Sequence, residues 1–421
     1  MKTWFFALLL FYLVPNIGNS QEQNYAREVV NILASDSLLG RGYVGRGDSL
    51  AAGFIKAEFE RFGIPSMYQP YTMAVNTFPE HITLQLGDST LIEGQDFLVN
   101  PASRTAMGTF ETVWLKTEDL FNDKRLEPKF RSAMGKVLVI PAVDESTLNP
   151  DQKARWRSFR DFLNNHPNNF VAGSIFLQSK KLTWYGAQHN QGRPAFDVLV
   201  DSAPQQFQEV TFSVTSEYYE AYPTQNVIAS IEGTKSDSVI VMMAHYDHFG
   251  FMGEAMFPGA NDNASGVAML LSMARYYAQY PPAYRMVFLA FSGEEIALLG
   301  SKYFVEHPTF DLLNTKFFFN FDLAGTGEDG IQVVNGSVFR TQFNRLKALN
   351  AETSLLPQVK IRGAACNSDH CLFDRQNLPG FYIYTLGGIN AYHDIYDRAE
   401  TLPLTKFDDY FELMRRFIDG F

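Results

Sequence analysis

Three short, mostly apolar segments constrain the fold of this chain more than any other feature of its sequence. They cover residues 238–244, 285–291 and 316–321 and are rich in β-branched or aromatic residues, which favours strands. Because apolar residues occupy both faces, each strand must be covered on both sides, as in a parallel sheet between layers of helices. Segments with helical spacing, 263–280 and 296–307, alternate with these strands. We therefore predict an α/β fold of three layers, αβα, with a mostly parallel central sheet.

The middle of the chain differs in character from its two ends. Residues 85–205 combine strand-like runs, such as 135–140, with loops rich in Asn, Gln and Pro, and they contain no cluster of metal-binding residue types. A chain of 421 residues is long enough to bury two moderate cores. We therefore predict a smaller, β-rich domain at 85–205 that lies over the cleft. It would be inserted between two parts of a catalytic domain, 21–84 and 206–421.

The first twenty residues have the pattern of a secretory signal peptide. Lys2 precedes an apolar run, 4–14, which is followed by Pro15 and by the small residues Gly18 and Ser20. An uncleaved anchor is the alternative, but the run is too short to cross a hydrocarbon layer of about 30 Å as a helix. We therefore predict cleavage before Gln21, export to the periplasm or the medium, and no stable membrane insertion afterwards.

The charge of the chain argues against nucleic acid as a partner. The formal net charge is −11, and no basic stretch is present that would neutralise phosphates. The sequence does not determine the oligomeric state.

Carboxylates and histidines follow the predicted strands. His245, the pair Glu294 and Glu295, and Asp322 each stand at or just beyond the end of one strand, and Asp262 stands at a turn that enters a helix. In sheets of this kind, ligands bind beyond the carboxyl ends of the strands. A further histidine, His393, occurs near the end of the chain. We therefore predict a metal site at this edge of the sheet.

Together these residue types make a balanced binuclear zinc site. Asp262 would be shared, Glu295 and His393 would hold one ion, and His245 and Asp322 would hold the other. Each residue alone has a plainer explanation, because a lone Asp262 could simply cap a helix and a lone Glu pair could be solvated.

Two further roles follow from the neighbouring acids. Glu294, beside the ligand Glu295, would act as the general base that takes a proton from water and passes it to the leaving amine. Asp247 would accept a hydrogen bond from the free ring nitrogen of His245 and so fix its tautomer.

The order and local wording of these segments resemble the co-catalytic zinc metallopeptidases of the bacterial leucyl-aminopeptidase-like family, M28. The matching segments are AHYDH at 244–248, GANDNASG at 259–266, SGEE at 292–295, LGS at 299–301, NFD at 320–322, and His393. The resemblance covers residues 206–421, and more loosely LGRG at 39–42, while the inserted region is similar to a protease-associated domain. Leu323, Ala324 and Asp394 depart from the usual residues of the family, which affects the polarity of the pocket and not the ligands.

The resemblance implies the same five ligands, the same base at Glu294, and a substrate pocket lined by Ser368, Asp369 and His370. Cys366 and Cys371 bracket that segment, and either a disulfide or two free thiols would fit their spacing.

The expected function is that of a di-zinc aminopeptidase. A glutaminyl-peptide cyclase with one zinc ion, a carboxypeptidase or dipeptidase, and a peptide-binding protein that has lost catalysis remain alternatives.

Overall fold

The computed structural model describes residues 19–421. The predicted signal peptide falls on residues 1–20 and therefore lies outside the described residues except for its last two, so its cleavage stays a prediction. The first described element is α1 (Asn19–Leu33), and a short irregular segment then leads into α2 (Gly47–Arg61). In residues 19–421, no helix combines the length and the apolar character needed to cross a membrane.

The larger of two eight-stranded sheets contains the three predicted strands. Its strand order is β1-β10-β14-β11-β15-β18-β16-β17. The four central strands run parallel, whereas β10 is antiparallel to β14 and to β1, and β16 is antiparallel to β18. The strands are β1 (Ser66–Thr77), β10 (Glu217–Ile231), β11 (Ser236–His245), β14 (Tyr284–Phe291), β15 (Thr315–Asp322), β16 (Ile331–Val334), β17 (Val359–Ile361) and β18 (Gly380–Thr385). The predicted strands at 238–244, 285–291 and 316–321 are confirmed as β11, β14 and β15.

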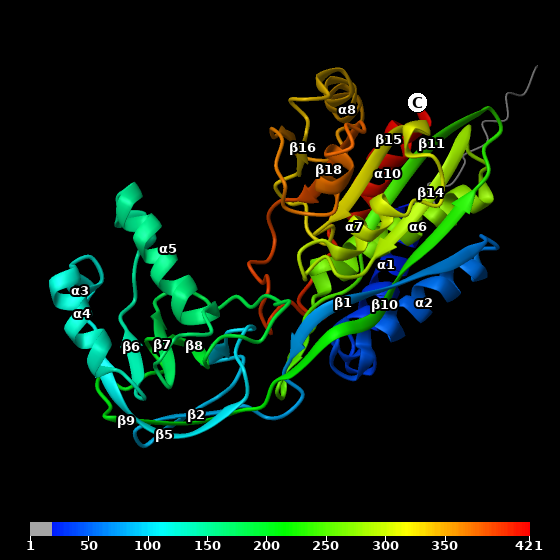
Figure 1. Cartoon of the computed structure of the whole chain (residues 1–421). Helices are drawn as coiled ribbons and strands as arrows, with labels where there is room; N and C mark the ends of the chain where they lie inside the picture. Colours follow the sequence, from blue (N-terminus) through cyan, green and yellow to red (C-terminus); the bar gives the residue numbers. More distant parts are fainter. Residues whose placement is uncertain (1–18) are drawn as a thin grey trace, which may run out of the picture.

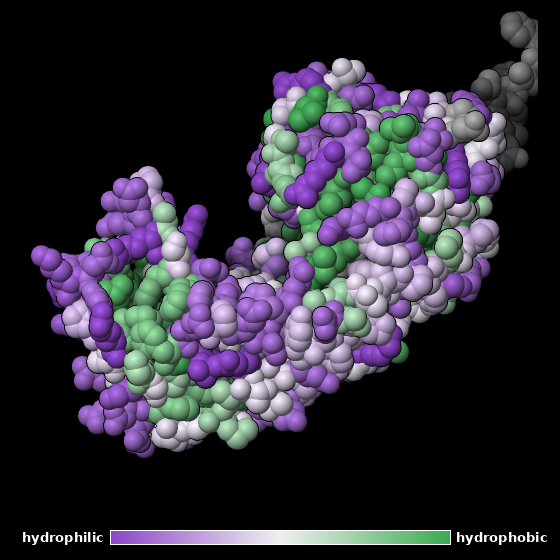
Figure 2. All heavy atoms as spheres, in the orientation of Figure 1, coloured by the Kyte–Doolittle hydropathy of each residue, from purple (hydrophilic) through white to green (hydrophobic). Residues whose placement is uncertain are grey.

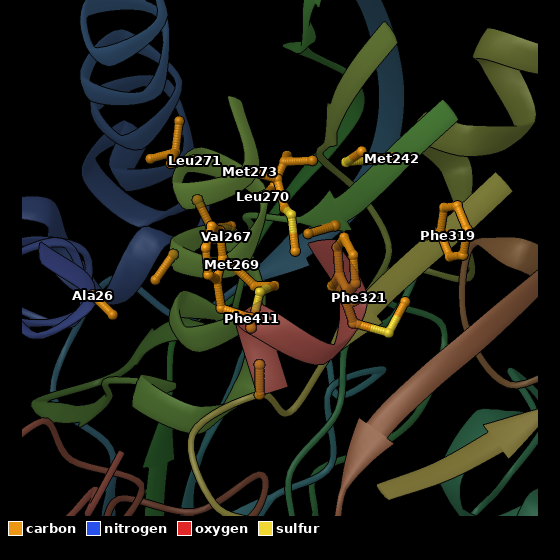
Figure 3. Packing of buried hydrophobic residues seen from close by; sticks show 14 of the residues in the cluster. Ala26, Met242, Val267, Met269, Leu270, Leu271, Met273, Phe319, Phe321 and Phe411 are labelled. Carbon is orange, nitrogen blue, oxygen red and sulfur yellow. The ribbon is translucent and has the colours of Figure 1, made fainter. Parts of the chain in front are cut away.

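Successive residues of the central strands pack into different cores, which is why these strands are apolar on both faces. Met242 of β11 belongs to a cluster that also contains residues of α1 and α2. The same cluster includes residues of α6 (Gly266–Gln279), α8 (Arg340–Thr353) and α10 (Phe407–Asp419). Figure 3 shows Met242 and Phe321 facing the α6 side chains in this cluster.

The opposite face of the sheet has a smaller core of its own. Val241 and Met243 of β11 pack there with residues of α7 (Leu299–Glu306) and α9 (His370–Asp374). Helices therefore cover both faces of the central strands, and the site at the strand ends lies between two packed layers.

Two of the predicted helices begin later than expected. The helix predicted from 263 begins at Gly266, after a π-type turn, Ala260–Ser265. The helix predicted from 296 begins at Leu299, because Ala297 and Leu298 adopt positive φ angles of 70° and 63°, which end a helix rather than start one. In both places the residues just before the helix carry predicted site side chains.

A second lobe is built on the other eight-stranded sheet. Its strand order is β3-β2-β9-β5-β6-β7-β8-β4. The strands are β2 (Thr83–Leu86), β3 (Ser89–Leu91), β4 (Phe97–Val99), β5 (Ala106–Trp114), β6 (Val137–Ile140), β7 (Gly173–Gln178), β8 (Ala195–Leu199) and β9 (Glu209–Val214). Three helices belong to this lobe: α3 (Thr117–Leu120), α4 (Asp123–Ser132) and α5 (Pro150–Asn165). The sheet begins two residues before the predicted insertion, 85–205, and its strand β9 lies wholly beyond the predicted end.

The two lobes are joined by β1 and β10, a long antiparallel pair that leads out of the first sheet and back into it (Figure 1). A hollow separates the upper parts of the lobes, as Figure 2 shows. The hairpin of β12 (Gly250–Met252) and β13 (Ala255–Phe257) packs into the core of the second lobe, so the lobes also share apolar contacts.

Candidate metal centre

The predicted ligands converge at the carboxyl edge of the parallel strands. His245 and Asp322 are the last residues of β11 and β15, and Glu294 and Glu295 come three and four residues after the end of β14. The remaining two ligands, Asp262 in the turn before α6 and His393 in the loop after β18, line the same cavity of about 340 Å³. The structure thus brings together all five predicted ligands and the predicted base.

Asp262 lies between the two histidines. Its Oδ1 is 3.3 Å from Nε2 of His245, and its Oδ2 is 3.0 Å from Nε2 of His393. Glu295 Oε2 lies 3.6 Å from His393 Nε2, and Asp322 Oδ1 lies 3.7 Å from His245 Nε2. Each histidine therefore has one oxygen of Asp262 and one further carboxylate beside it. This is the arrangement that two ions bridged by one carboxylate require.

The protonation chemistry of the site also fits dications. Burial raises the pKa values of Glu294 and Glu295 well above their ordinary range, and neighbouring carboxylates, such as Asp262, raise them further. Asp322 Oδ1 is buried without a hydrogen-bond partner in the described part of the chain. Because clustered, buried carboxylates are costly unless a cation compensates them, the residues present fit two divalent ions.

Both histidine ligands present the same ring nitrogen to the site. His245 Nδ1 lies 3.2 Å from the backbone carbonyl oxygen of Asp247, and His393 Nδ1 lies 3.0 Å from that of Trp184. A carbonyl oxygen can only accept, so each Nδ1 donates and each Nε2 keeps its lone pair for a metal. Trp184 belongs to the second lobe, and sequence reasoning gave it no role.

Asp247 serves a different partner from the one predicted. Its carboxylate is 3.7 Å from His245 Nδ1, whereas it accepts a hydrogen bond of 2.6 Å from the hydroxyl of Tyr43. It also accepts the backbone N–H groups of Glu294 and Glu295, each at 3.3 Å. The carboxylate of Asp247 therefore positions the turn that carries the base and its neighbouring ligand, and its backbone carbonyl fixes the tautomer of His245.

His248 is a site residue that sequence reasoning missed. Its Nδ1 lies 2.6 Å from Oε1 of Glu295, and burial lowers its pKa well below the ordinary value. A neutral imidazole donates from Nδ1, so His248 orients Glu295 and leaves Oε2 toward His393. Its position in the segment AHYDH, three residues after His245, is the sequence signal for this role.

Arg41 and Asp397 hold the turn that contains Asp262. The guanidinium of Arg41 is fully buried and donates to five backbone carbonyls, those of Leu33, Tyr246, Pro258, Gly259 and Asp262. The carboxylate of Asp397 accepts the backbone N–H groups of Asn261 and Asp262 at 2.8 and 2.9 Å. The arginine of the LGRG segment at 39–42 therefore has a structural role, because it connects the N-terminal part of the chain to the turn that carries Asp262.

The structure corrects the predicted roles of Ser368, Asp369 and His370. All three are fully buried behind the cavity, and Asn367 is the residue of this segment that lines it. Ser368 donates a hydrogen bond of 3.2 Å to Asp322, and the His370 ring stacks on Tyr382 at 4.6 Å between centroids. Cys366 and Cys371 form a disulfide around the segment. The segment therefore supports a ligand and a wall of the cavity from behind.

The remaining wall of the cavity is aromatic. Tyr382 and Tyr384 come from β18, Tyr392 precedes His393, and Tyr185 comes from the second lobe. Arg362, just after β17, completes the lining.

A mostly parallel α/β sheet with histidines and carboxylates gathered at its carboxyl edge defines the chain as a metallohydrolase-like protein. Residues 226–418 match the model of peptidase family M28, so the chain is similar to that family over this segment. Aminopeptidase YwaD of Bacillus subtilis (strain 168) is 37% identical over 106 residues, which are 24% of this chain and 22% of that protein. A probable zinc metalloprotease of Pyricularia oryzae is 40% identical over 111 residues, 25% of this chain and 22% of that protein. The chain thus spans about a fifth of the length of these relatives.

Solved structures are similar over nearly the whole chain, the second lobe included. The zinc aminopeptidase BSAP of Bacillus subtilis superposes with a TM-score of 0.69 at 19% identity, covering 94% of each chain. A peptidase M28 precursor from Shewanella amazonensis gives a TM-score of 0.68 at 16% identity, covering 95% of this chain and 96% of that one. At such identities the likeness describes the fold.

Proposed function

We propose that this protein is a zinc-dependent aminopeptidase that removes N-terminal residues from peptides. The observation that carries the proposal is the placement of Asp262, whose two oxygens face the Nε2 atoms of two different histidines. The match of residues 226–418 to a peptidase family and the names of the similar proteins support zinc and peptide hydrolysis. The pattern of residues 1–20 supports export to the periplasm or the medium.

Two zinc ions, when bound, would polarise the scissile carbonyl and lower the pKa of water, so that a water molecule can be deprotonated for attack near neutral pH. His245 and Asp322 would hold one ion, His393 and Glu295 the other, and Asp262 would hold both. Asp247, His248 and the backbone carbonyl of Trp184 would keep these groups in place.

Glu294 would move the proton. Its carboxylate lines the cavity and groups with His245 and Asp322. This placement puts its carboxylate beside the proposed ligands, where it can serve as a general base. From this position it would accept a proton from the attacking water and deliver it to the leaving amine. A cavity of about 340 Å³ is near the small end for ligand sites, which suits recognition of a chain end.

We also propose that the second lobe is an inserted, protease-associated-like domain that completes the metal centre. Its bridging segment, residues 181–188, meets the loop of His393 (Figure 1). Trp184 N–H donates to the carbonyl of His393 at 2.8 Å, while His393 Nδ1 donates back to the carbonyl of Trp184. Lys181 Nζ donates to the carbonyls of Asn390 and Tyr392 and to the carboxylate of Asp394, at 2.7, 3.1 and 2.9 Å.

The experiment that tests the activity is mass spectrometry of a mixed peptide pool incubated with the purified protein. The pool contains free and N-acetylated peptides, some of which begin with Gln, and one half receives a chelator. We expect chelator-sensitive trimming confined to free N-termini. Loss of ammonia from peptides that begin with Gln would identify a cyclase. Loss of C-terminal residues would identify a carboxypeptidase, and an unchanged pool would support a peptide-binding protein.

A further inference from the structure

Arg362 stands apart from the other charged residues of the cavity. Among the described residues that line it, Arg362 carries the one permanent positive charge, whereas four of the others are carboxylates, Asp262, Glu294, Glu295 and Asp322. Among the side chains that the structure describes, its guanidinium forms no ion pair with a carboxylate within 4.0 Å, and it donates a hydrogen bond to the hydroxyl of Tyr384. An arginine that faces a cavity without such a partner is free to bind an anion that enters the cavity.

The position of Arg362 is fixed by its surroundings. Its backbone N–H donates to Val333 at 2.9 Å, and its carbonyl accepts from Ser337 at 3.2 Å. Its Nη1 donates to the hydroxyl of Tyr384 at 3.0 Å. Arg362 is exposed, and this one hydrogen bond leaves the other guanidinium donors available at the mouth of the cavity that the residue lines. A planar guanidinium that is oriented in advance suits a carboxylate, whose two oxygens it can engage together.

The charge balance of the cavity leaves this cation in excess. Two divalent ions would offset the four carboxylates, as the proposed function requires, and the charge of Arg362 then has no counterpart in the lining. Tyr185 and Tyr392 line the same cavity, are 44% and 43% exposed, and offer apolar contact to the side chains of a bound peptide. The free cavity thus favours a substrate that carries a negative charge away from its N-terminus.

We propose that Arg362, positioned by Tyr384, binds a carboxylate of the peptide substrate. The enzyme would accordingly prefer peptides that present a carboxylate close to the scissile bond. Two sources have this chemistry, an Asp or Glu side chain near the N-terminus and the C-terminal carboxylate of a di- or tripeptide. The inference rests on the proposed aminopeptidase function, which supplies the bound peptide.

The test uses matched substrate pairs with the zinc-loaded protein. In one pair, Leu-Gly-Gly and its amide differ only in the C-terminal carboxylate. In the other, Leu-Asp-Ala-amide and Leu-Asn-Ala-amide differ only in the side chain. The readout is the ratio of kcat/KM within each pair, compared between the wild type, Arg362→Met and Lys360→Met. Lys360 is an exposed lysine of β17, two residues before Arg362, and it does not line the cavity, so it controls for loss of charge nearby.

We expect the wild type to favour the charged member of at least one pair, and Arg362→Met to reduce that ratio about tenfold or more, since hydrogen bonds between ionised groups are worth this much. Lys360→Met should keep the wild-type ratio. A reduced ratio in the amide pair identifies the C-terminal carboxylate, and a reduced ratio in the Asp/Asn pair identifies the side chain. An unchanged ratio in both pairs overturns the proposal, as does an equal loss on charged and neutral members.

A binding measurement separates this inference from the proposed function. Calorimetric titration of the same peptides into Glu294→Gln protein reports the carboxylate preference without turnover. If the wild type cleaves none of the four peptides while Arg362→Met in that background weakens binding of the charged ones, the aminopeptidase proposal fails and the carboxylate site stands. If the background binds charged and neutral peptides equally, the carboxylate site fails whatever the activity.

Discussion

At the scale of the residue, the site depends on which atom of each side chain is already engaged. The Nδ1 atoms of His245 and His393 are tied to backbone carbonyls, and His248 ties one oxygen of Glu295. What remains facing the cavity is one nitrogen or one oxygen of each ligand. Because one atom of each side chain is held by the protein, the other atom is already oriented toward the cavity before any ion binds.

Glu294 is the residue whose replacement separates chemistry from metal binding. Glu294→Gln removes the basic oxygen but keeps the size of the side chain and all five ligands. We expect kcat to fall by about 10²- to 10⁴-fold, the usual worth of a general base. Metal content by inductively coupled plasma mass spectrometry should equal that of the wild type. Full activity in this variant would remove Glu294 from the mechanism.

Asp119 offers a test of pH-dependent stability away from the site. Burial would raise its pKa, but Lys129, the backbone N–H of Lys116 and Arg125 outweigh it and lower the pKa from 3.8 to about 2. A carboxyl group with a lowered pKa stabilises the fold above its unfolded pKa, and this stabilisation is lost as the pH falls toward 2.

We therefore expect Asp119→Asn to reduce the free energy of unfolding by about 2 kcal/mol at neutral pH, since hydrogen bonds to a charged group are lost. In urea titrations, the difference from the wild type should narrow once the pH falls below about 4. A difference that stays constant from pH 6 to pH 3 would show that the charge of Asp119 does not stabilise the second lobe.

At the scale of the element, the bridging segment couples the two lobes. It reaches the loop after β18 through Lys181 and Trp184, and its Gln188 side chain donates to the carbonyl of Ile296 at 3.1 Å. It therefore touches the chain close to His393 on one side and close to Glu295 on the other. These are the two residues assigned to the same ion.

Removing the amine of Lys181 should weaken the binding of the zinc ion that His393 and Glu295 would hold. Lys181→Met loses three hydrogen bonds that hold residues 390–394, and outer contacts of this kind change metal affinity by about 10- to 100-fold. We expect a lower zinc content after dialysis against a zinc buffer, and partial recovery with Lys181→Arg. Lys180→Met is the matched control, because Lys180 is 78% exposed and its one ion pair among the described residues is with Asp144 at 3.6 Å. Equal zinc content in the two methionine variants would contradict the proposed role of the second lobe.

At the scale of the whole molecule, both lobes and the N-terminal helices meet at one edge of the larger sheet. Arg41 brings the segment after α1 to the turn of Asp262, and Trp184 brings the second lobe to His393. A ligand that bridges these parts stabilises all of them at once, because it binds the folded arrangement and not the unfolded chain.

Metal removal should therefore lower the melting temperature of the entire protein. At a zinc concentration about 1,000 times the dissociation constant, binding adds about 4 kcal/mol to stability. We expect differential scanning calorimetry to show a lower Tm after treatment with a chelator and its return with added zinc. Identical melting curves would mean that the buried carboxylates are compensated without metal.

Much of the fold and most of the site can be predicted from the sequence, for one physical reason. Each ligand on a strand lies next to the apolar run that forms the strand, so local periodicity places it at the sheet edge. This holds for His245 and Asp322, the last residues of their strands, and Glu295 follows its strand after a short turn. The same reasoning is less exact at helix starts, because the positive φ angles of Ala297 and Leu298 leave no clear mark on the sequence.

The sequence by itself determined the strand segments and the order of the histidines and carboxylates that meet at the edge of the sheet. Only the tertiary structure decided which partners hold them: Trp184 for His393, Arg41 for the turn of Asp262, and a buried position for Ser368, Asp369 and His370. The reason is that side-chain periodicity is a local property of the chain, whereas these contacts join segments up to 221 residues apart. Such contacts exist only once the lobes and layers have packed.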